Sequence, residues 1–494
     1  MDSDLSLSKS LFIRGLQCHK SLYLHRHHPE LKDETPLSRQ ALFRSGSAVG
    51  IVAQDLFPGG TTIPYDADTY DRQVKLTEEA ISRGVTTLYE AAFRFDDVFV
   101  KVDILNKGKG GWDLYEVKSS TSIKDVYMPD AAIQYYVVKG SGLPVSGIFL
   151  VHINNQYVRE GEIEVGKLFV VNDVTSEVRE MQSVVEGELD TLKTMLRGDM
   201  PQIDIGPHCT DPYDCDFMGH CWSHIPEDSV FTIRGSKTLP FTLYNRGIID
   251  LHDVPMHMLP ANQKLQVEAT LEKKIVVSEE AIRDFLDSLW YPLYFLDFET
   301  FGAPIPPFDG IRPYQQVPFQ YSLHYLEDED ANLRHHEYLA DPKIDPREEL
   351  AGKLVSEIPH NACVLAYYAG FEAGVLQGLA GWLPKYQDDI DTILNNLRDL
   401  AVPFKKKALY HWQFRGSYSL KYVLPALVPD LSYKDMEIQD GDMAMQAYFR
   451  MQESGDPKEI KQLRNALLAY CGLDTLGMVR LIERLKEFIG YRET

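Results

Sequence analysis

The stretch YFLDFETF, residues 294–301, constrains this chain more than any other, because it places two acids at the end of an apolar run. An unpaired carboxylate is expensive to remove from water. Asp297 and Glu299 are two residues apart, and on a strand such residues point to the same face. Carboxylates that share a face are typical ligands of a divalent cation. The alternative is a strand end that reaches solvent.

If this pair binds cations for phosphoryl chemistry, later elements should supply more carboxylates, because two cations need more ligands than one strand offers. Glu372 is a candidate, since VLAYYAGFEAG predicts a buried strand, a turn and a helix start. Tyr470 and Asp474 are four residues apart in a predicted helix and therefore share a face. The sequence thus predicts a magnesium or manganese site built from several elements.

A second acidic group lies in the segment FVKVDILNKGKGGWDLYEVKSS, residues 99–120. The segment predicts two strands joined by a glycine-rich turn. Folding about the turn brings Asp103 near Glu116, and Lys118 shares a face with Glu116. The two carboxylates could bind a magnesium or manganese ion while the ammonium orients or activates a water. The helix predicted downstream would place Gln134 beside this hairpin. A surface hairpin with cross-strand ion pairs is the alternative.

The six cysteines fall into two classes. Cys209, Cys215 and Cys221 are evenly spaced, and with Cys18 they could bind zinc or an iron–sulfur cluster; His208, His220 and His224 are further zinc ligands. A site without metal stays open. Cys363 and Cys471 are expected to be core residues.

The formal charge of −23 argues against a protein that coats nucleic acid by bulk electrostatics. Residues 403–422, PFKKKALYHWQFRGSYSLKY, nevertheless interleave cations with aromatic side chains and contain no acid. Such a segment suits a nucleic-acid strand, with charges on phosphates and rings under bases; a solvated loop is the alternative. The predicted nucleic-acid-binding residues are Lys405, Lys406, Lys407, Arg415 and Lys421.

A chain of 494 residues is expected to form two or three domains. We predict an α/β unit over residues 10–225, a helical connector over 226–289 and a second α/β unit over 290–494. The first twenty residues have no basic start followed by a long apolar run, and no membrane-spanning window is apparent. The sequence therefore predicts a cytoplasmic protein without a membrane partner.

The hairpin segment resembles the PD-(D/E)XK nucleases of the RecB type. This resemblance implies a restriction-endonuclease-like fold with Asp103 and Glu116 as metal ligands, Lys118 as the catalytic lysine and Gln134 as a supporting residue. Many relatives have a histidine four residues after a glycine, whereas this chain has Gln54 after Gly50. A neutral amide is a poorer ligand than imidazole. One cysteine before the core and three after it resemble the iron–sulfur members, including the CRISPR-associated exonucleases. That resemblance implies a 4Fe-4S cluster on Cys18, Cys209, Cys215 and Cys221.

The later acids resemble the DEDD exonucleases of the DnaQ type, which have a ribonuclease H-like fold. The resemblance implies two cations bound by Asp297, Glu299, Glu372 and Asp474, with Tyr470 orienting the attacking water and a 3′-to-5′ direction. Most of that superfamily has aspartate where Glu372 stands. The C-terminal half also resembles an uncharacterised bacterial domain often fused to RecB-like nucleases.

Together these features predict a metal-dependent nuclease acting on DNA, single-stranded by preference, with RNA left open as a substrate. DNA repair or processing, or antiphage defence with protein partners, is the expected setting. In one alternative only the DEDD site is active and the RecB-like half holds nucleic acid. In another the chain is a non-catalytic adaptor.

Overall fold

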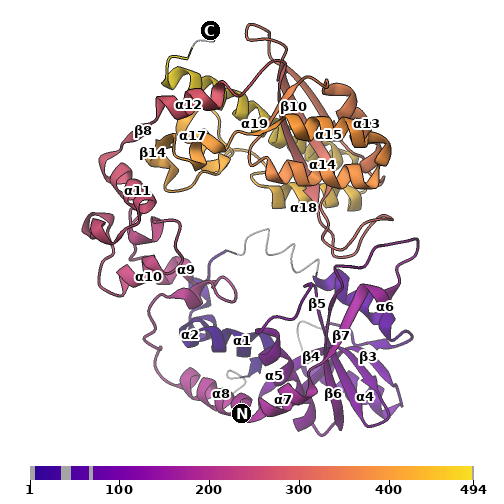
Figure 1. Ribbon diagram of the computed structural model, residues 1–494. Coiled ribbons are helices and arrows are strands. Elements are labelled where there is room, and N and C mark those ends of the chain that lie inside the picture. Colours follow the sequence, from indigo (N-terminus) through magenta and orange to yellow (C-terminus); the bar gives the residue numbers. More distant parts are fainter. Residues whose placement is uncertain (1–5, 35–45, 66–69, 492–494) are drawn as a thin grey trace. The chain divides into compact units, whose positions relative to one another are not determined.

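The computed structural model is a mixed α/β protein that divides into two compact units (Figure 1). It describes residues 6–34, 46–65 and 70–491. Unit 1 comprises Met1–His224 and Ala303–Tyr314, and unit 2 comprises Ile225–Gly302 and Gln315–Thr494. Each unit has its own mixed sheet, so the α/β class predicted from the sequence is confirmed.

Unit 1 is built on a seven-stranded sheet in the order β2-β3-β4-β5-β6-β7, with β1 paired to β4. The strands are β1 Leu7–Ser8, β2 Thr61–Thr62, β3 Thr87–Phe95, β4 Val98–Lys107, β5 Trp112–Lys118, β6 Val145–Ile153 and β7 Phe169–Asp173. β3, β4 and β5 are antiparallel neighbours, whereas β5 and β6 are parallel. The predicted hairpin is confirmed as β4 and β5. Its turn requires Gly111, because a Cβ there would lie 2.5 Å from the Pro144 carbonyl oxygen.

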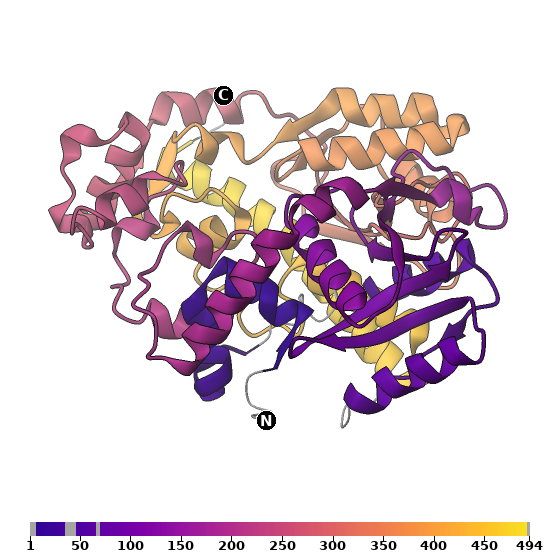
Figure 2. The same ribbon diagram turned by 90° about the horizontal axis from the view of Figure 1, so that it is seen from below.

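The helices of unit 1 pack on this sheet and on one another. Its elements include α1 Lys9–Gln17, α2 His19–His27, η2 Pro29–Leu31, η3 Gln54–Leu56, α4 Tyr70–Ser82, α5 Tyr127–Gly140, α6 Val165–Leu168, α7 Thr175–Glu180, α8 Gln182–Arg197, η4 Pro207–Cys209 and α9 Met218–Cys221. Figure 2 shows α8, in magenta, lying along the indigo helices α1 and α2, and all three are in contact. α5 packs on β3, β4 and β6, which brings its side chains close to the predicted hairpin.

Unit 2 is built on a five-stranded sheet in the order β11-β10-β9-β12-β13. The strands are β9 Leu293–Phe301, β10 Val317–Leu326, β11 Arg334–Leu339, β12 Cys363–Ala366 and β13 Leu397–Asp399. β10 is antiparallel to both of its neighbours, whereas β9, β12 and β13 are parallel to one another. The carboxyl ends of three parallel strands therefore meet at one edge of the sheet, where ligand sites of α/β sheets commonly lie.

Helices cover both faces of the unit 2 sheet (Figure 1). The main helices are α13 Arg347–Glu357, α14 Gly370–Trp382, α15 Gln387–Asn396, α17 Leu420–Leu427, α18 Gly441–Glu453 and α19 Pro457–Phe488. Successive residues of β10 contact opposite layers. Gln320 donates to the carbonyl oxygen of Leu467 in α19, and the Tyr321 hydroxyl donates to Glu357 in α13. Asp297 and Glu299 are paired in register with Ser322 and Gln320, so they lie on the face that α19 covers.

The segment that precedes β9 is made of short elements with a small core of their own. They are η5 Val230–Thr232, α10 Leu239–Tyr244, η6 Leu251–Asp253, η7 Met256–Met258, α11 Ala261–Glu272, β8 Ile275–Val277 and α12 Glu279–Leu286. Val230, Leu243 and Val267 are fully buried in this core. β8 pairs with β14 Leu409–His411, which is flanked by α16 Val402–Lys405 and η9 Trp412–Phe414, whereas η8 Pro384–Tyr386 lies between α14 and α15. In the described part of the chain, no helix is long and apolar enough to cross a membrane.

Candidate functional site

The central strand of unit 2 carries the first two acids. β9 continues two residues beyond Glu299 to Phe301, because β10 pairs with it as far as Val317 opposite Phe301. The prediction that the strand ends at the acids is therefore wrong in this detail. On its other side β9 pairs with β12 over residues 293–295 and no further. Asp297 and Glu299 therefore lie just beyond the last residue of β9 that is paired with β12.

Glu372 reaches the same site from the helix that follows β12. It lies in the first turn of α14 and is only 2% exposed. Its Oε2 is buried and has no hydrogen-bond partner among the described residues. Asp399, at the end of β13, accepts hydrogen bonds from the backbone N–H groups of Tyr368 and Ala401. Asp399 thus orders the turn that precedes Glu372.

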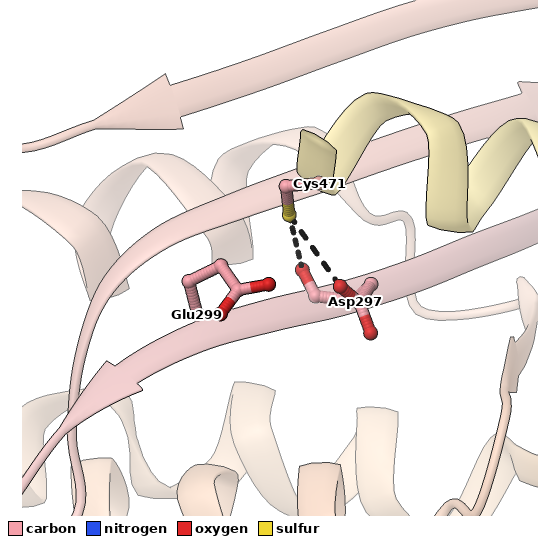
Figure 3. Close-up of side chains that lie close together, drawn as sticks. All are labelled: Asp297, Glu299 and Cys471. Carbon is pink, nitrogen blue, oxygen red and sulfur yellow. Dashed lines mark hydrogen bonds between the residues drawn. The ribbon is translucent and has the colours of Figure 1, made fainter. Parts of the chain in front are cut away.

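Helix α19 brings the remaining predicted residues to the face of β9. Asp474 and Tyr470 are both buried, on one side of this helix. Cys471 follows Tyr470 directly in the sequence of this helix. Its thiol donates a hydrogen bond to Asp297, with 3.5 Å from Sγ to Oδ2 (Figure 3). One ligand atom each from Asp297, Glu299 and Cys471 lie within 4.8 Å of one another. Cys471 is buried as predicted, but its contact with Asp297 places it inside the site, which sequence analysis missed.

The acids of unit 2 raise one another's pKa values. Burial, followed by the charges of Asp474, Glu299 and Glu372, holds the pKa of Asp297 well above its usual range. Burial raises the pKa of Glu372 to about 8 and that of Asp474 to about 7. The pKa of Glu299 is likewise raised well above its usual value by burial and by Asp474. Four carboxylates from three segments therefore share one buried space.

Little positive charge offsets these acids. The Lys421 ammonium lowers the pKa values of Glu299 and Asp474. Within the described ranges, none of the four acids forms an ion pair. Bound cations would favour the charged carboxylates and give the orphaned Glu372 oxygen a partner, so the donor set fits divalent metal ions.

Tyr433 is a further site residue that sequence analysis missed. It lies in the loop between α17 and α18 and is 8% exposed. Its hydroxyl donates to Oδ1 of Asp474, and its ring lies 6.0 Å from that of Tyr470. Nothing in the local sequence DLSYKD distinguishes this tyrosine from a core residue, because its partner lies 41 residues away.

The predicted basic residues do not all lie at this site. Lys421 is close enough to affect the acids, as described above. Arg415 instead pairs with Glu227, at 2.5 Å, and Lys407 donates to the carbonyl oxygen of Asn262 at 3.0 Å. Lys405 and Lys406 are exposed. Only Lys421 of the five is thus brought to the carboxylates.

In unit 1 the hairpin brings its predicted residues together. The Asp103 carboxylate accepts from the backbone N–H of Val117 at 2.7 Å. Lys118 donates to Oε1 of Glu116 at 2.6 Å, and Gln134 donates to Oε2 of Glu116 at 2.6 Å. Gln54, by contrast, contributes its backbone to a different contact, because its carbonyl oxygen accepts a hydrogen bond from the Tyr89 hydroxyl. The side chains of the β4–β5 hairpin and of α5 therefore form one buried polar cluster around Glu116.

Sequence analysis missed three charged residues at this centre. Asp130 in α5 pairs with Lys118, and its position four residues before Gln134 was a usable signal, since such residues share a helix face. Lys9 in α1 pairs with Glu116 at 2.7 Å, across a sequence distance that no local pattern reveals. Glu90 in β3 has φ +59°, an uncommon conformation for a side-chain-bearing residue. It pairs with Lys101 at 2.7 Å.

The charges of unit 1 are arranged differently from those of unit 2. Burial, and then the charge of Glu116, raises the pKa of Asp103 to about 8. The ammonium groups of Lys118 and Lys9 overcome the burial of Glu116 and hold its pKa below the usual range. Burial lowers the pKa values of both lysines, but the charges of Glu116 and Asp130 outweigh it and raise both pKa values above the usual range. This centre is an ion-pair network, whereas the unit 2 centre is a group of uncompensated acids.

The four predicted cysteine ligands line one small cavity in unit 1. Its lining includes Cys18, Cys209, Cys215 and Cys221, together with Ser21, His208 and Trp222. All four thiols are free. Burial raises the pKa values of Cys18 and Cys221, and the neighbouring cysteines add to both shifts. No three of these sulfurs lie within 4.8 Å of one another, since the described chain's one group of that kind is elsewhere.

Comparison with known families gives one match. A family model described as a domain of unknown function (DUF2779) matches residues 294–419. The matched segment contains Asp297, Glu299 and Glu372, whereas Tyr470 and Asp474 lie beyond it. A search of curated proteins finds no match to the chain. The family description assigns no activity, so the function has to be argued from the site.

Proposed function

We propose that the acidic centre of unit 2 binds two divalent cations, magnesium or manganese, and hydrolyses phosphodiester bonds at the 3′ end of a nucleic-acid strand. Single-stranded DNA is the first choice of substrate. The observation that carries this proposal is the convergence of Asp297, Glu299, Glu372 and Asp474 in one buried space without ion pairs. Such an arrangement destabilises a chain unless cations offset it. The strand order of the unit 2 sheet is compatible with a ribonuclease H-like fold.

The side chains around the acids suit this reaction. Bound cations would supply charge stabilisation and a more acidic attacking water. Burial, and then the charges of Asp474, Glu299 and Asp297, raises the pKa of the Tyr470 hydroxyl and keeps it protonated. It can therefore hold a water or a phosphate oxygen by donating a hydrogen bond. Lys421 can contact a non-bridging phosphate oxygen.

For unit 1 we propose a RecB-like PD-(D/E)XK centre in which Lys118 is the catalytic lysine, Asp103 and Glu116 face a cation, and Gln134 supports Glu116. We also propose a 4Fe-4S cluster on the four cysteines that line the cavity. Sulfurs around one zinc ion lie about 3.8 Å apart, as follows from a Zn–S bond of about 2.3 Å. Among the described residues no three of these sulfurs lie within 4.8 Å of one another, so the thiols are not arranged as a closed zinc tetrahedron.

The proposal is tested with 5′-end-labelled single-stranded DNA, duplex DNA and RNA in the presence of manganese. We expect single-stranded DNA to be shortened stepwise from its 3′ end. Lys118→Ala and Asp474→Ala variants assign the activity to a unit. A full-length protein that degrades none of the three substrates, with manganese or magnesium, would overturn the proposal.

A second candidate is that unit 2 alone is active and unit 1 holds nucleic acid. The ion-pair network around Glu116 favours it, because those acids are already offset by lysines. In that case Lys118→Ala leaves the rate of hydrolysis unchanged and weakens DNA binding.

The two tyrosines near Asp474 should differ in their effects. Tyr470→Phe removes a hydroxyl free to contact water or substrate, and we expect kcat to fall about tenfold, the cost of one hydrogen bond. Tyr433→Phe removes the hydrogen bond to Asp474 and should mainly weaken manganese binding, seen as a higher metal concentration at half-maximal rate. Equal losses of kcat in both variants, at saturating manganese, would contradict this division.

The cysteine cavity gives a separate prediction. Anaerobically purified protein should be brown, with a broad absorption band at about 400 nm from thiolate-to-iron charge transfer. Cys215→Ser should lose the colour, and Cys363→Ser, which alters a cysteine outside the cavity, should keep it. Colourless protein with stoichiometric zinc would contradict the cluster.

A further inference from the structure

Lys9 occupies the acidic centre of unit 1 alongside Lys118. Its Nζ lies 2.7 Å from Oε1 of Glu116 and 3.4 Å from Oδ1 of Asp130. The side chain is only 25% exposed. Lys9 begins α1, and the two residues before it form β1, which pairs with β4 beside Val98 and Phe99. The N-terminal segment is therefore anchored to the strand that carries Asp103, which fixes the start of α1 near the acids.

The bonds of Glu116 show what Lys9 does there. Oε1 of Glu116 accepts from both Lys9 and Lys118, and Oε2 accepts from Gln134. Both oxygens of the central carboxylate are thus already bonded by donors of the chain. A cation that binds Glu116 on Oε1 has to displace or share one of two ammonium groups.

The charges lead to the same conclusion. Glu116 and Asp130 face two lysines, so both of these acids are offset, whereas Asp103 forms no ion pair among the described residues. Glu90, which lies close enough to act on Asp103, is paired with Lys101. An ammonium fixed among carboxylates repels an incoming cation and lowers the affinity of the acids for it. In unit 2 the acids form no ion pairs in the described chain, and only the more distant charge of Lys421 opposes a cation there.

We infer that Lys9 takes the place of one divalent cation at the unit 1 centre, so that this centre binds at most one such ion. The inference rests on the proposed function, because it concerns metal binding by the same nuclease fold. Lys9 is in this account a positioning residue that holds Glu116 and Asp130. The acids of unit 1 do not fit a two-cation site, and the missing histidine at Gln54 agrees with that.

The test measures manganese binding by electron paramagnetic resonance in full-length protein. Asp297→Asn and Asp474→Asn are introduced first, so that the unit 2 centre is removed from the titration. In this background we expect the parent to bind at most one Mn²⁺ weakly. Lys9→Met keeps the length of the side chain and removes its charge, and it should bind Mn²⁺ about tenfold or more tightly, or bind one additional ion. Manganese prefers oxygen ligands, so the cysteines do not compete.

Two further variants make the outcome decisive. Lys9→Arg keeps the charge and should bind Mn²⁺ as the parent does. Lys193→Met removes another largely buried lysine of unit 1, one that pairs with Asp96 away from the acids, and should also match the parent. Unchanged or weaker Mn²⁺ binding in folded Lys9→Met protein would overturn the inference. Because the readout is binding and not hydrolysis, failure of the proposed function appears separately, as wild-type protein that degrades no DNA.

Discussion

Asp474→Asn is expected to lower manganese-dependent degradation of single-stranded DNA by about a thousandfold, because one of the carboxylates that would hold the cations becomes a neutral amide. The amide oxygen still accepts from Tyr433, whose hydroxyl donates to Asp474 in the structure, so the fold is retained. End-labelled DNA, sampled over several decades of time, measures the loss.

The same variant should be more stable than the parent when no metal is present. Asp474 is buried and raises the pKa values of Asp297 and Glu299, so removing its charge relieves repulsion. Glu483→Gln provides a control on the exposed side of the same helix, and it should leave hydrolysis unchanged. A full rate in Asp474→Asn protein would contradict the assignment of this acid.

Metal-free protein is expected to lose stability as the pH rises from about 5 to about 8. The folded-state pKa values of Asp474 and Glu372 are about 7 and about 8, above their usual values of 3.8 and 4.5. In this window the folded chain keeps protons that the unfolded chain has released, so the free energy of unfolding falls with increasing pH. Each such proton is worth about 1.4 kcal/mol per pH unit, and we expect a total loss of about 3 kcal/mol or more. Denaturant unfolding in EDTA at several pH values measures it.

Manganese should remove most of this pH dependence, since bound cations favour the charged carboxylates. Asp103, whose pKa is raised to about 8, adds a similar slope in every variant. The contribution of unit 2 is therefore the difference between the parent and Glu372→Gln/Asp474→Asn. The structure indicates that these acids repel one another, and a difference of zero would contradict this.

Local sequence patterns were sufficient for much of the fold. The glycine-rich turn between two strand-like runs predicts β4 and β5, and the four-residue spacing of Tyr470 and Asp474 predicts that both lie on one face of α19. The sequence does not reveal that β9 continues to Phe301, because its pairing with β10 up to that residue is a long-range contact.

The site residues that were missed share one property. Lys9 reaches Glu116 across 107 residues, and Tyr433 reaches Asp474 across 41. A lysine in a helical first turn and a tyrosine in a loop have no local signal of chemistry, because only the tertiary fold supplies their partners. The same holds for Cys471. Its neighbours in the sequence are mostly apolar and give no sign of the contact with Asp297, which lies 174 residues away.

The central claim, a two-cation centre in unit 2, is tested most directly by diffraction at the manganese absorption edge from crystals soaked in Mn²⁺. We predict two anomalous peaks among the carboxylates of Asp297, Glu299, Glu372 and Asp474. One of them should contact Glu372, whose buried Oε2 has no hydrogen-bond partner in the described part of the chain. No peak within coordinating distance of these four carboxylates, in crystals that bind manganese elsewhere, would contradict the claim.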